Sequence, residues 1–371
     1  MKNQRRTREK DPEFYPKLLA LLVPMVIQNV MNALVSASDA LMVGTLDQSS
    51  LSAVSLATQI TFVLSLFYAA ITIGTTVMAA QYWGKGDKTA VEKIMALAFR
   101  LAAVISVIFF LACFFAPQLL MRIFTSEEDL IRLGSSYLKI AGWSYLLSGI
   151  SQVYLCIMKN TGRTTRSTIY GTSATVLNLI LNAIFIYGLF GVPKMAVAGA
   201  AVATLLARIV EFGLCFIENM RTDTVKVRVE YLLKNSGLLG KDFARYTTPI
   251  LANELAWGCG FTMFSVILGH MGSDAVAANS IANITKNILL CVAFGISGGS
   301  GILVGNELGD GNLEKAREYG DRLCHLALAT GIISGLILLA VSPLIVRACT
   351  TMSPTAKGYL QGMLLICAYS I

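Results

Sequence analysis

Asp39 lies in the apolar run PMVIQNVMNALVSASDALMVG, which begins at Pro24 and is long enough to span a bilayer. A carboxylate at membrane depth costs roughly 2.5–3.5 kcal/mol on insertion scales, so such residues usually face a wet cavity and bind ions or protons. Loss of water favours the neutral acid, which suits reversible protonation, whereas a bound cation favours the charged form. The alternative is a structural aspartate near the outer interface, since Gly44 ends the run five residues later.

Two asparagines, Asn178 and Asn182, lie four residues apart in another apolar run, so a helix places them on one face. Their amides need hydrogen-bond partners inside a membrane, because an unsatisfied amide in hydrocarbon is costly. Interhelical hydrogen bonds would satisfy them. Together with Asp39 they also make a cation or proton site, and both interpretations stay open at this point.

Glu254 is a second acid in an apolar run, with Asn253 directly before it and Trp257 about one helical turn later. It is either an interfacial residue whose carboxylate reaches water or a second acid that lines the other half of the molecule. Pro24 and Pro249 each fall inside a predicted helix, where proline removes a backbone hydrogen bond and permits a kink. Each proline is either a passive bend or a hinge.

The composition indicates a polytopic membrane protein. The chain has 371 residues, of which 55% are hydrophobic and only 14% charged, against about 25% charged residues in soluble domains. The net charge of +8 comes largely from short loops between apolar runs, so it predicts membrane orientation and no nucleic-acid partner. The eight cysteines and two histidines show no metal-ligand spacing. We expect no cofactor, no metal site and no enzyme activity.

The apolar runs predict an all-α fold with about ten transmembrane helices, the last one cut short. Their limits are 16–44, 51–82, 94–121, 131–158, 167–190, 195–218, 243–270, 275–305, 318–347 and 356–371. Lys and Arg concentrate before the first run and in every second loop thereafter. By the positive-inside rule, the N-terminus is cytoplasmic.

The second half of the chain repeats the first at a shift of 249 − 24 = 225 residues, which carries Pro24 onto Pro249 and Gly84 onto Gly309. Six spans precede the long basic loop, so both halves insert the same way up, as parallel repeats. We expect an N-terminal six-helix lobe at 1–217, a cytoplasmic loop at 218–242 and a C-terminal lobe at 243–371. The C-terminal lobe lacks counterparts of the last two helices of the first, so we expect a truncated chain and twelve helices in the complete protein.

These features together resemble the multidrug and toxic compound extrusion (MATE) family. They are the series Pro24, Asp39 and Gly44, the glycine pairs at 84/86 and 309/311, and the segment LNLILNAIFIYG followed by VAGAAVAT. The resemblance implies two lobes around a central cavity and export driven by a proton or sodium gradient.

The resemblance also implies a cation site in the first lobe. The family's first-helix aspartate is matched by Asp39, its fifth-helix asparagine by Asn178 and its sixth-helix threonine by Thr204. Where many members have a second aspartate, this chain has Asn182, so one formal charge is absent from the site. Some members have a seventh-helix glutamate that lies deeper than Glu254.

We therefore expect a monomeric antiporter in the cytoplasmic membrane, coupled to H⁺ or Na⁺, which exports small lipophilic or cationic organic compounds by alternating access. One alternative is a lipid-linked oligosaccharide flippase of the same superfamily. It would carry basic residues in its cavity for pyrophosphate, and Arg100 and Arg208 are the nearest candidates. A further alternative is a non-transporting receptor or scaffold, which would have no need of Asp39 and two nearby amides.

Overall fold

The computed structural model describes residues 12–44, 48–191, 193, 195–221, 225–233, 237–271, 273–348 and 353–370. Some side chains inside these ranges, including that of Asp39, lie outside the description. The elements are α1 (Phe14–Gly44), α2 (Gln48–Gly84), α3 (Lys88–Phe115), α4 (Pro117–Arg122), α5 (Glu128–Asn160), α6 (Thr164–Tyr187), the short 3₁₀ helix η1 (Leu189–Gly191), α7 (Ala196–Asn219), α8 (Val229–Leu233), α9 (Gly237–His270), α10 (Ser273–Gly309), α11 (Leu313–Ala348) and α12 (Pro354–Ser370).

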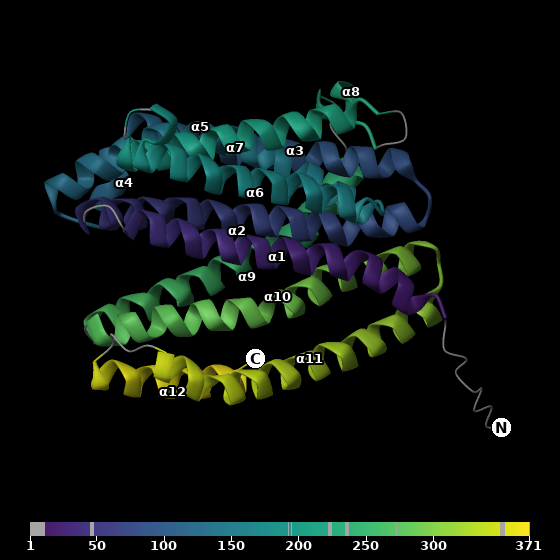
Figure 1. The fold of residues 1–371 in the computed structure, drawn as a ribbon. Helices are drawn as coiled ribbons and strands as arrows, with labels where there is room; N and C mark the ends of the chain where they lie inside the picture. The colour runs from purple at the N-terminus through teal and green to yellow at the C-terminus, as the bar shows by residue number, and fades with distance from the viewer. Residues whose placement is uncertain are drawn as a thin grey trace.

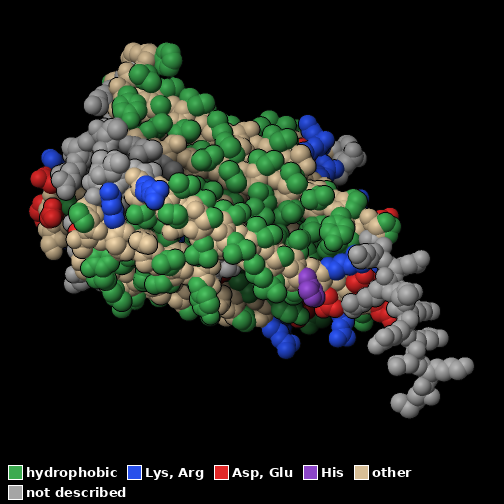
Figure 2. Space-filling view, turned by 60° about the horizontal axis from the view of Figure 1, so that its bottom comes forward, with side chains coloured by type: hydrophobic (Ala, Val, Ile, Leu, Met, Phe, Trp, Pro, Cys, Tyr) green, Lys and Arg blue, Asp and Glu red, His purple; other side chains and the backbone are tan. Residues whose placement is uncertain are grey.

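The predicted all-α membrane fold is confirmed. Every described element is a helix, and eight of them are long and apolar enough to cross a membrane: α1, α2, α3, α5, α6, α7, α10 and α11. The other two expected spans are helices α9 and α12, which are not among those eight. Exposed apolar side chains such as Ile332, Ile333 and Leu336 on α11 would face lipid. Figure 2 shows hydrophobic side chains over most of one face, with Lys and Arg gathered mainly toward its two ends.

The structure adds elements that hydropathy alone did not predict. The third expected run breaks at Ala116, because Pro117 disfavours a helical residue before it and starts the new helix α4. Helix α3 begins earlier than expected, at Lys88, where the Asp87 carboxylate accepts a hydrogen bond from the Ala90 N–H at 2.9 Å. Helix α8 and the start of α9 lie inside the expected loop 218–242, because these helices are too polar to register as apolar runs.

Two groups of helices pack against each other (Figure 1). Helices α1 to α7 form the first group and α9 to α12 the second, and they meet where α1 and α2 contact α9 and α10. In the first group, one buried cluster joins α2, α3 and α5 around Ile94, Met95 and Ile157. In the second, α10, α11 and α12 share a cluster around Leu338 and Leu360. The two groups of helices agree with a two-lobe fold, and the lobe bounds 1–217 and 243–371 stay predictions.

The repeat is visible in the geometry of the helices. The shift of 249 − 24 = 225 residues carries the bounds of α2, 48–84, onto those of α10, 273–309. It also carries the turn glycine Gly86, at φ +78°, onto Gly311, at φ +83°. Only glycine adopts this left-handed conformation without strain. The glycine pairs predicted from the sequence therefore end α2 and α10 with the same turn.

The contact between α2 and α10 is also reciprocal. A Cβ atom at Gly84 would overlap the backbone carbonyl of Asn306, and one at Gly309 would overlap that of Gln81. Gln81 and Asn306 are themselves repeat partners, so each lobe places its glycine on the other lobe's backbone. Small residues let helix backbones approach closely in this way. The contact is where the two lobes touch most closely along these helices.

We expect Gly309→Ala to destabilise the protein by about 1–3 kcal/mol, the usual cost of overpacking a close contact. The added methyl group meets rigid backbone, which cannot move aside as a side chain can. The measurement is the midpoint of thermal unfolding in detergent. Gly301→Ala on the same helix is the control, because its methyl group would lie 3.6 Å from Thr76 Cγ2, an ordinary contact. Equal midpoints for the two variants would contradict the close-contact interpretation.

Candidate cation and substrate site

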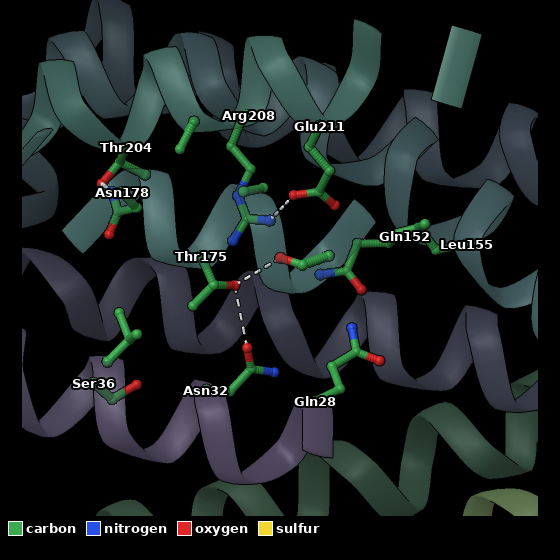
Figure 3. A pocket seen from close by; sticks show the side chains of 14 residues that line it. Gln28, Asn32, Ser36, Gln152, Leu155, Thr175, Asn178, Thr204, Arg208 and Glu211 are labelled. Carbon is green, nitrogen blue, oxygen red and sulfur yellow. Dashed lines mark hydrogen bonds and ion pairs between the residues drawn. The ribbon is translucent and has the colours of Figure 1, made fainter. Parts of the chain in front are cut away.

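A cavity of about 270 Å³ opens between α1, α5, α6 and α7 in the first lobe (Figure 3). Apolar side chains form part of its wall, among them Val35 and Leu155. The polar residues that line it are Gln28, Asn32, Ser36, Gln152, Thr175, Asn178, Thr204, Arg208 and Glu211. Amide and hydroxyl groups thus dominate its polar lining, with one guanidinium and one carboxylate among the described residues. A polar cavity enclosed by membrane-spanning helices can hold an ion or a small polar molecule.

Three of the four residues expected at a cation site form a hydrogen-bonded chain. Asn182 Nδ2 donates to Asn178 Oδ1 at 3.4 Å, and Asn178 Nδ2 donates to Thr204 Oγ1 at 3.3 Å. Thr204 Oγ1 in turn donates to the Ala200 carbonyl at 3.0 Å. The i and i+4 spacing places the two asparagines on one face of α6, as predicted. The interhelical hydrogen bond that was the alternative to a cation site is thus present, and it connects residues that line the cavity.

Asp39 lies on α1, but its side chain lies outside the described part of the structure. Its position in the helix is nevertheless informative. Gln28, Asn32 and Ser36 line the cavity at successive intervals of four residues, and Asp39 follows Asn32 by seven. Residues at i, i+4 and i+7 share one face of a helix. The spacing along α1 is thus consistent with a place for Asp39 on this face, and its part in the site stays a prediction.

A hydrogen bond fastens α1 to α6 across this cavity. Thr175 Oγ1 lies 3.2 Å from Asn32 Oδ1, and it lies 2.9 Å from the carbonyl of Gly171 in its own helix. Position 171 has little room for a side chain because Gln28 fills the adjacent space: a Cβ atom at Gly171 would lie 2.5 Å from Gln28 Nε2. These contacts hold the cavity-lining face of α1 against α6.

The structure also brings two charged residues into the cavity that the sequence analysis did not assign to this site. Arg208 and Glu211 lie three residues apart on α7 and form an ion pair through Arg208 Nη1 and Glu211 Oε2. Both line the cavity. Two opposite charges at a helical spacing inside an apolar run are a signal that the sequence carries; of the two residues, only Arg208 was weighed above, as a candidate for a flippase.

Asn253, Glu254 and Trp257 lie on α9, in the second lobe. None of them lines the cavity of the first lobe. Trp257 is 58% exposed and stacks on Phe261, with ring centroids 5.7 Å apart. The cavity role of Glu254 and the hinge roles of Pro24 and Pro249 stay predictions.

Comparison with known proteins agrees with this architecture. A family model described as MatE matches residues 24–184 and 249–370, which is more than half of the chain. The probable multidrug resistance protein NorM of Thermotoga maritima is 28% identical over 345 residues, covering 93% of this chain and 74% of its own length. The multidrug resistance protein MdtK of Pectobacterium atrosepticum is 25% identical over 331 residues, covering 87% and 69%.

Solved structures share the fold. An outward-facing multidrug resistance MATE family transporter of the MOP superfamily superposes with a TM-score of 0.83 at 22% identity, covering 94% of this chain and 77% of its own. A MOP superfamily transporter from Pyrococcus furiosus gives 0.83 at 21%, with the same coverage.

The apolar spanning helices and the relatives named as multidrug resistance proteins make this chain a polytopic membrane transporter rather than an enzyme. This chain belongs to the MatE family, that is, the multidrug and toxic compound extrusion transporters. The resemblance seen in the sequence is therefore confirmed.

Proposed function

We propose that this protein is an antiporter that couples the entry of H⁺ or Na⁺ to the export of small organic compounds. The observation that carries the proposal is the hydrogen-bonded chain from Asn182 through Asn178 to Thr204, because Asn178 and Thr204 line a cavity between apolar helices. The names of the relatives support export, because NorM and MdtK are named multidrug resistance proteins.

In this proposal, Asp39, Asn178, Asn182 and Thr204 hold the coupling cation or proton. Amides can accept from a protonated carboxyl or donate to a charged one, so both states of Asp39 would find partners. Occupancy of the site would favour one arrangement of α1, and bound substrate would favour the other. Each ligand can shift that balance only by its differential affinity for the two states. Pro24 and Pro249 would serve as the hinges of α1 and α9, with Glu254 as a second acid.

The proposal extends to the setting of the protein. The basic loops favour a cytoplasmic N-terminus in the cytoplasmic membrane. We further propose a monomer with lobes at 1–217 and 243–371 that requires no cofactor besides the coupling ion. The organic cations expected from the sequence remain one candidate substrate class, to be measured directly.

The test is dye uptake into inside-out membrane vesicles that contain the protein, under proton and sodium gradients imposed separately. Two dyes cover both charge types: ethidium, a cation, and carboxyfluorescein, an anion. We expect one gradient to drive accumulation of at least one dye, with vesicles lacking the protein as background. Accumulation at background level for both dyes under both gradients would refute the antiporter.

The flippase alternative is less favoured by the cavity. Recognition of a pyrophosphate calls for several cationic side chains, and among the described residues Arg208 alone supplies one to the cavity lining. Arg100, the other candidate, lies on α3 and donates to the carbonyl of Tyr231 instead, at 3.4 Å.

Asn182→Asp is expected to tighten sodium binding by about tenfold, equivalent to 1.4 kcal/mol. Two carboxylates offset a bound cation better than one, and Asn182 already contacts Asn178 of the proposed site. The measurement is equilibrium binding of radioactive sodium to purified protein. Asn253→Asp is the matched control, because Asn253 is exposed on α9 and does not line the cavity. An unchanged sodium affinity in Asn182→Asp would remove this position from the cation site.

A further inference from the structure

Arg208 occupies the middle of a membrane-spanning helix. The apolar span of α7 runs from Val197 to Asn219, so Arg208 lies eleven residues from either end. A guanidinium at this depth is costly and marks a functional site by default. Its environment is consistent with such a role, because Arg208 lines the polar cavity instead of facing lipid.

The two partners of the Arg208–Glu211 ion pair are not equally enclosed. The side chain of Glu211 is only 2% exposed, whereas that of Arg208 is 34% exposed. The carboxylate therefore sits in the protein wall and the guanidinium stands at the cavity surface. In Figure 3 the guanidinium points into the cavity, toward Thr175. The contact with Glu211 uses Nη1, and a guanidinium has five N–H donors in a planar fork.

The Arg208–Glu211 pair is the charged part of the described cavity lining. Among the described residues that line the cavity, Glu211 is the only acid. Because the Glu211 carboxylate is buried and the Arg208 guanidinium is partly exposed, the charged group that the described wall presents to a ligand is the guanidinium.

The rest of the cavity suits an organic anion better than a bare inorganic ion. Gln28, Asn32 and Gln152 offer amide groups along the wall, while Val35 and Leu155 offer apolar contact. A ligand with an apolar body and one carboxylate could satisfy both kinds of surface. A carboxylate matches the guanidinium fork in a bidentate geometry that is both strong and directional.

We propose that Arg208 is the anion-binding residue of this cavity and that the cavity takes small organic molecules that carry a carboxylate. The proposal names a substrate class for the proposed transport function. It rests on that function for the claim that the bound anion is a transported substrate. It differs from the sequence-based expectation of lipophilic cations, because that expectation assumed a cavity with few basic residues. A simpler role for Arg208, neutralising Glu211, does not account for the exposure of the guanidinium at the cavity surface.

The test is equilibrium dialysis of radiolabelled indole-3-propionate and its primary amide, indole-3-propionamide, against purified protein in lipid nanodiscs at pH 7. The two probes share one shape and differ in charge. The wild-type protein is expected to bind the carboxylate about tenfold more tightly than the amide. In Arg208→Gln this preference should fall to within about twofold, and Arg208→Lys should keep part of it, since it retains the charge but loses the fork.

Three further variants make the result specific. Arg100→Gln, which removes a cation outside the cavity, should keep the full preference. Glu211→Gln should increase carboxylate affinity, because it frees Arg208 from its partner. The double variant with Arg208→Gln and Glu211→Gln removes both charges together, so no buried carboxylate loses its partner, and it should also lose the preference.

Equal affinity of the wild-type protein for the two probes would overturn the proposal, and so would a preference that survives in both Arg208→Gln and the double variant. The assay uses no ion gradient. If the wild-type protein transported dye but did not prefer the carboxylate probe, only the role of Arg208 would be refuted. If it preferred the carboxylate probe but gave no gradient-driven dye transport, only the antiporter would be refuted.

Discussion

Asp39→Asn is expected to reach the membrane in normal amount and to reduce gradient-driven dye transport to background. Asparagine keeps the shape of the side chain and removes its titration and its charge. The spacing along α1 is consistent with a place for Asp39 on the same face as Asn32 and Ser36, which line the cavity. Without the carboxylate, neither a proton nor a cation would have a charged partner at the proposed site, since Glu211 is already paired with Arg208.

The measurement is dye accumulation in inside-out vesicles, with membrane content of the protein determined in parallel. Asp129→Asn makes the same chemical change in the exposed first turn of α5, where Asp129 pairs with Arg132 at 3.4 Å on the protein surface, and should transport normally. Binding of indole-3-propionate to Asp39→Asn should survive if Arg208 holds the anion. Full transport by Asp39→Asn at normal membrane content would remove Asp39 from the mechanism.

The fold was largely predictable from the sequence, because hydropathy and repetition are strong signals in membrane proteins. A long helix covers most of each of the ten expected runs, and the shift that carries Pro24 onto Pro249 also carries α2 onto α10. Local polar chemistry at helix ends was harder to predict. Hydropathy gave no sign that Asp87 would cap α3 or that Pro117 would split the third run. The cap depends on one hydrogen bond from a side chain, and the break depends on the restriction that proline places on the residue before it.

The candidate site was predictable in part. The asparagines of α6 and Thr204 of α7 lie together as expected, because the family pattern and the i, i+4 spacing both point to them. The cavity wall on α1 was missed, although Gln28, Asn32 and Ser36 recur at intervals of four residues. A single uncharged polar residue in a long apolar run is a weaker indication of a functional site than an acidic residue is.

The roles of Arg208 and Glu211 depend on tertiary structure. Their spacing on α7 predicts an ion pair, but the packing of α7 against α5 and α6 decides which of the two side chains is buried. Sequence spacing cannot reveal which partner of the pair reaches the cavity. The expectation of a cation-binding cavity therefore rested on the count of acids, whereas the structure adds where each charge is exposed.

Glu218→Gln is expected to produce the largest loss of stability of the substitutions considered. The side chain of Glu218, at the end of α7, is fully buried. Its carboxylate oxygens accept from Arg163 Nη1 and Arg166 Nη1, each at 3.0 Å, and from the Tyr170 hydroxyl at 2.8 Å. Arg221 Nε lies 3.4 Å away. One carboxylate thus joins the turn between α5 and α6 to the end of α7.

A glutamine at 218 would leave three arginines close together without the carboxylate that holds them. Removing one partner of a buried ion pair costs about 3–5 kcal/mol, and we expect the lower end of this range, because the arginine side chains are partly exposed to water. The measurement is the midpoint of thermal unfolding in detergent. The control is Glu128→Gln, which breaks the exposed pair between Glu128 and Arg122, 3.6 Å apart, and should change stability by less than about 1 kcal/mol. If Glu218→Gln unfolded at the same temperature as this control, the ion pairs of Glu218 with the arginines would not contribute measurably to the stability of the protein.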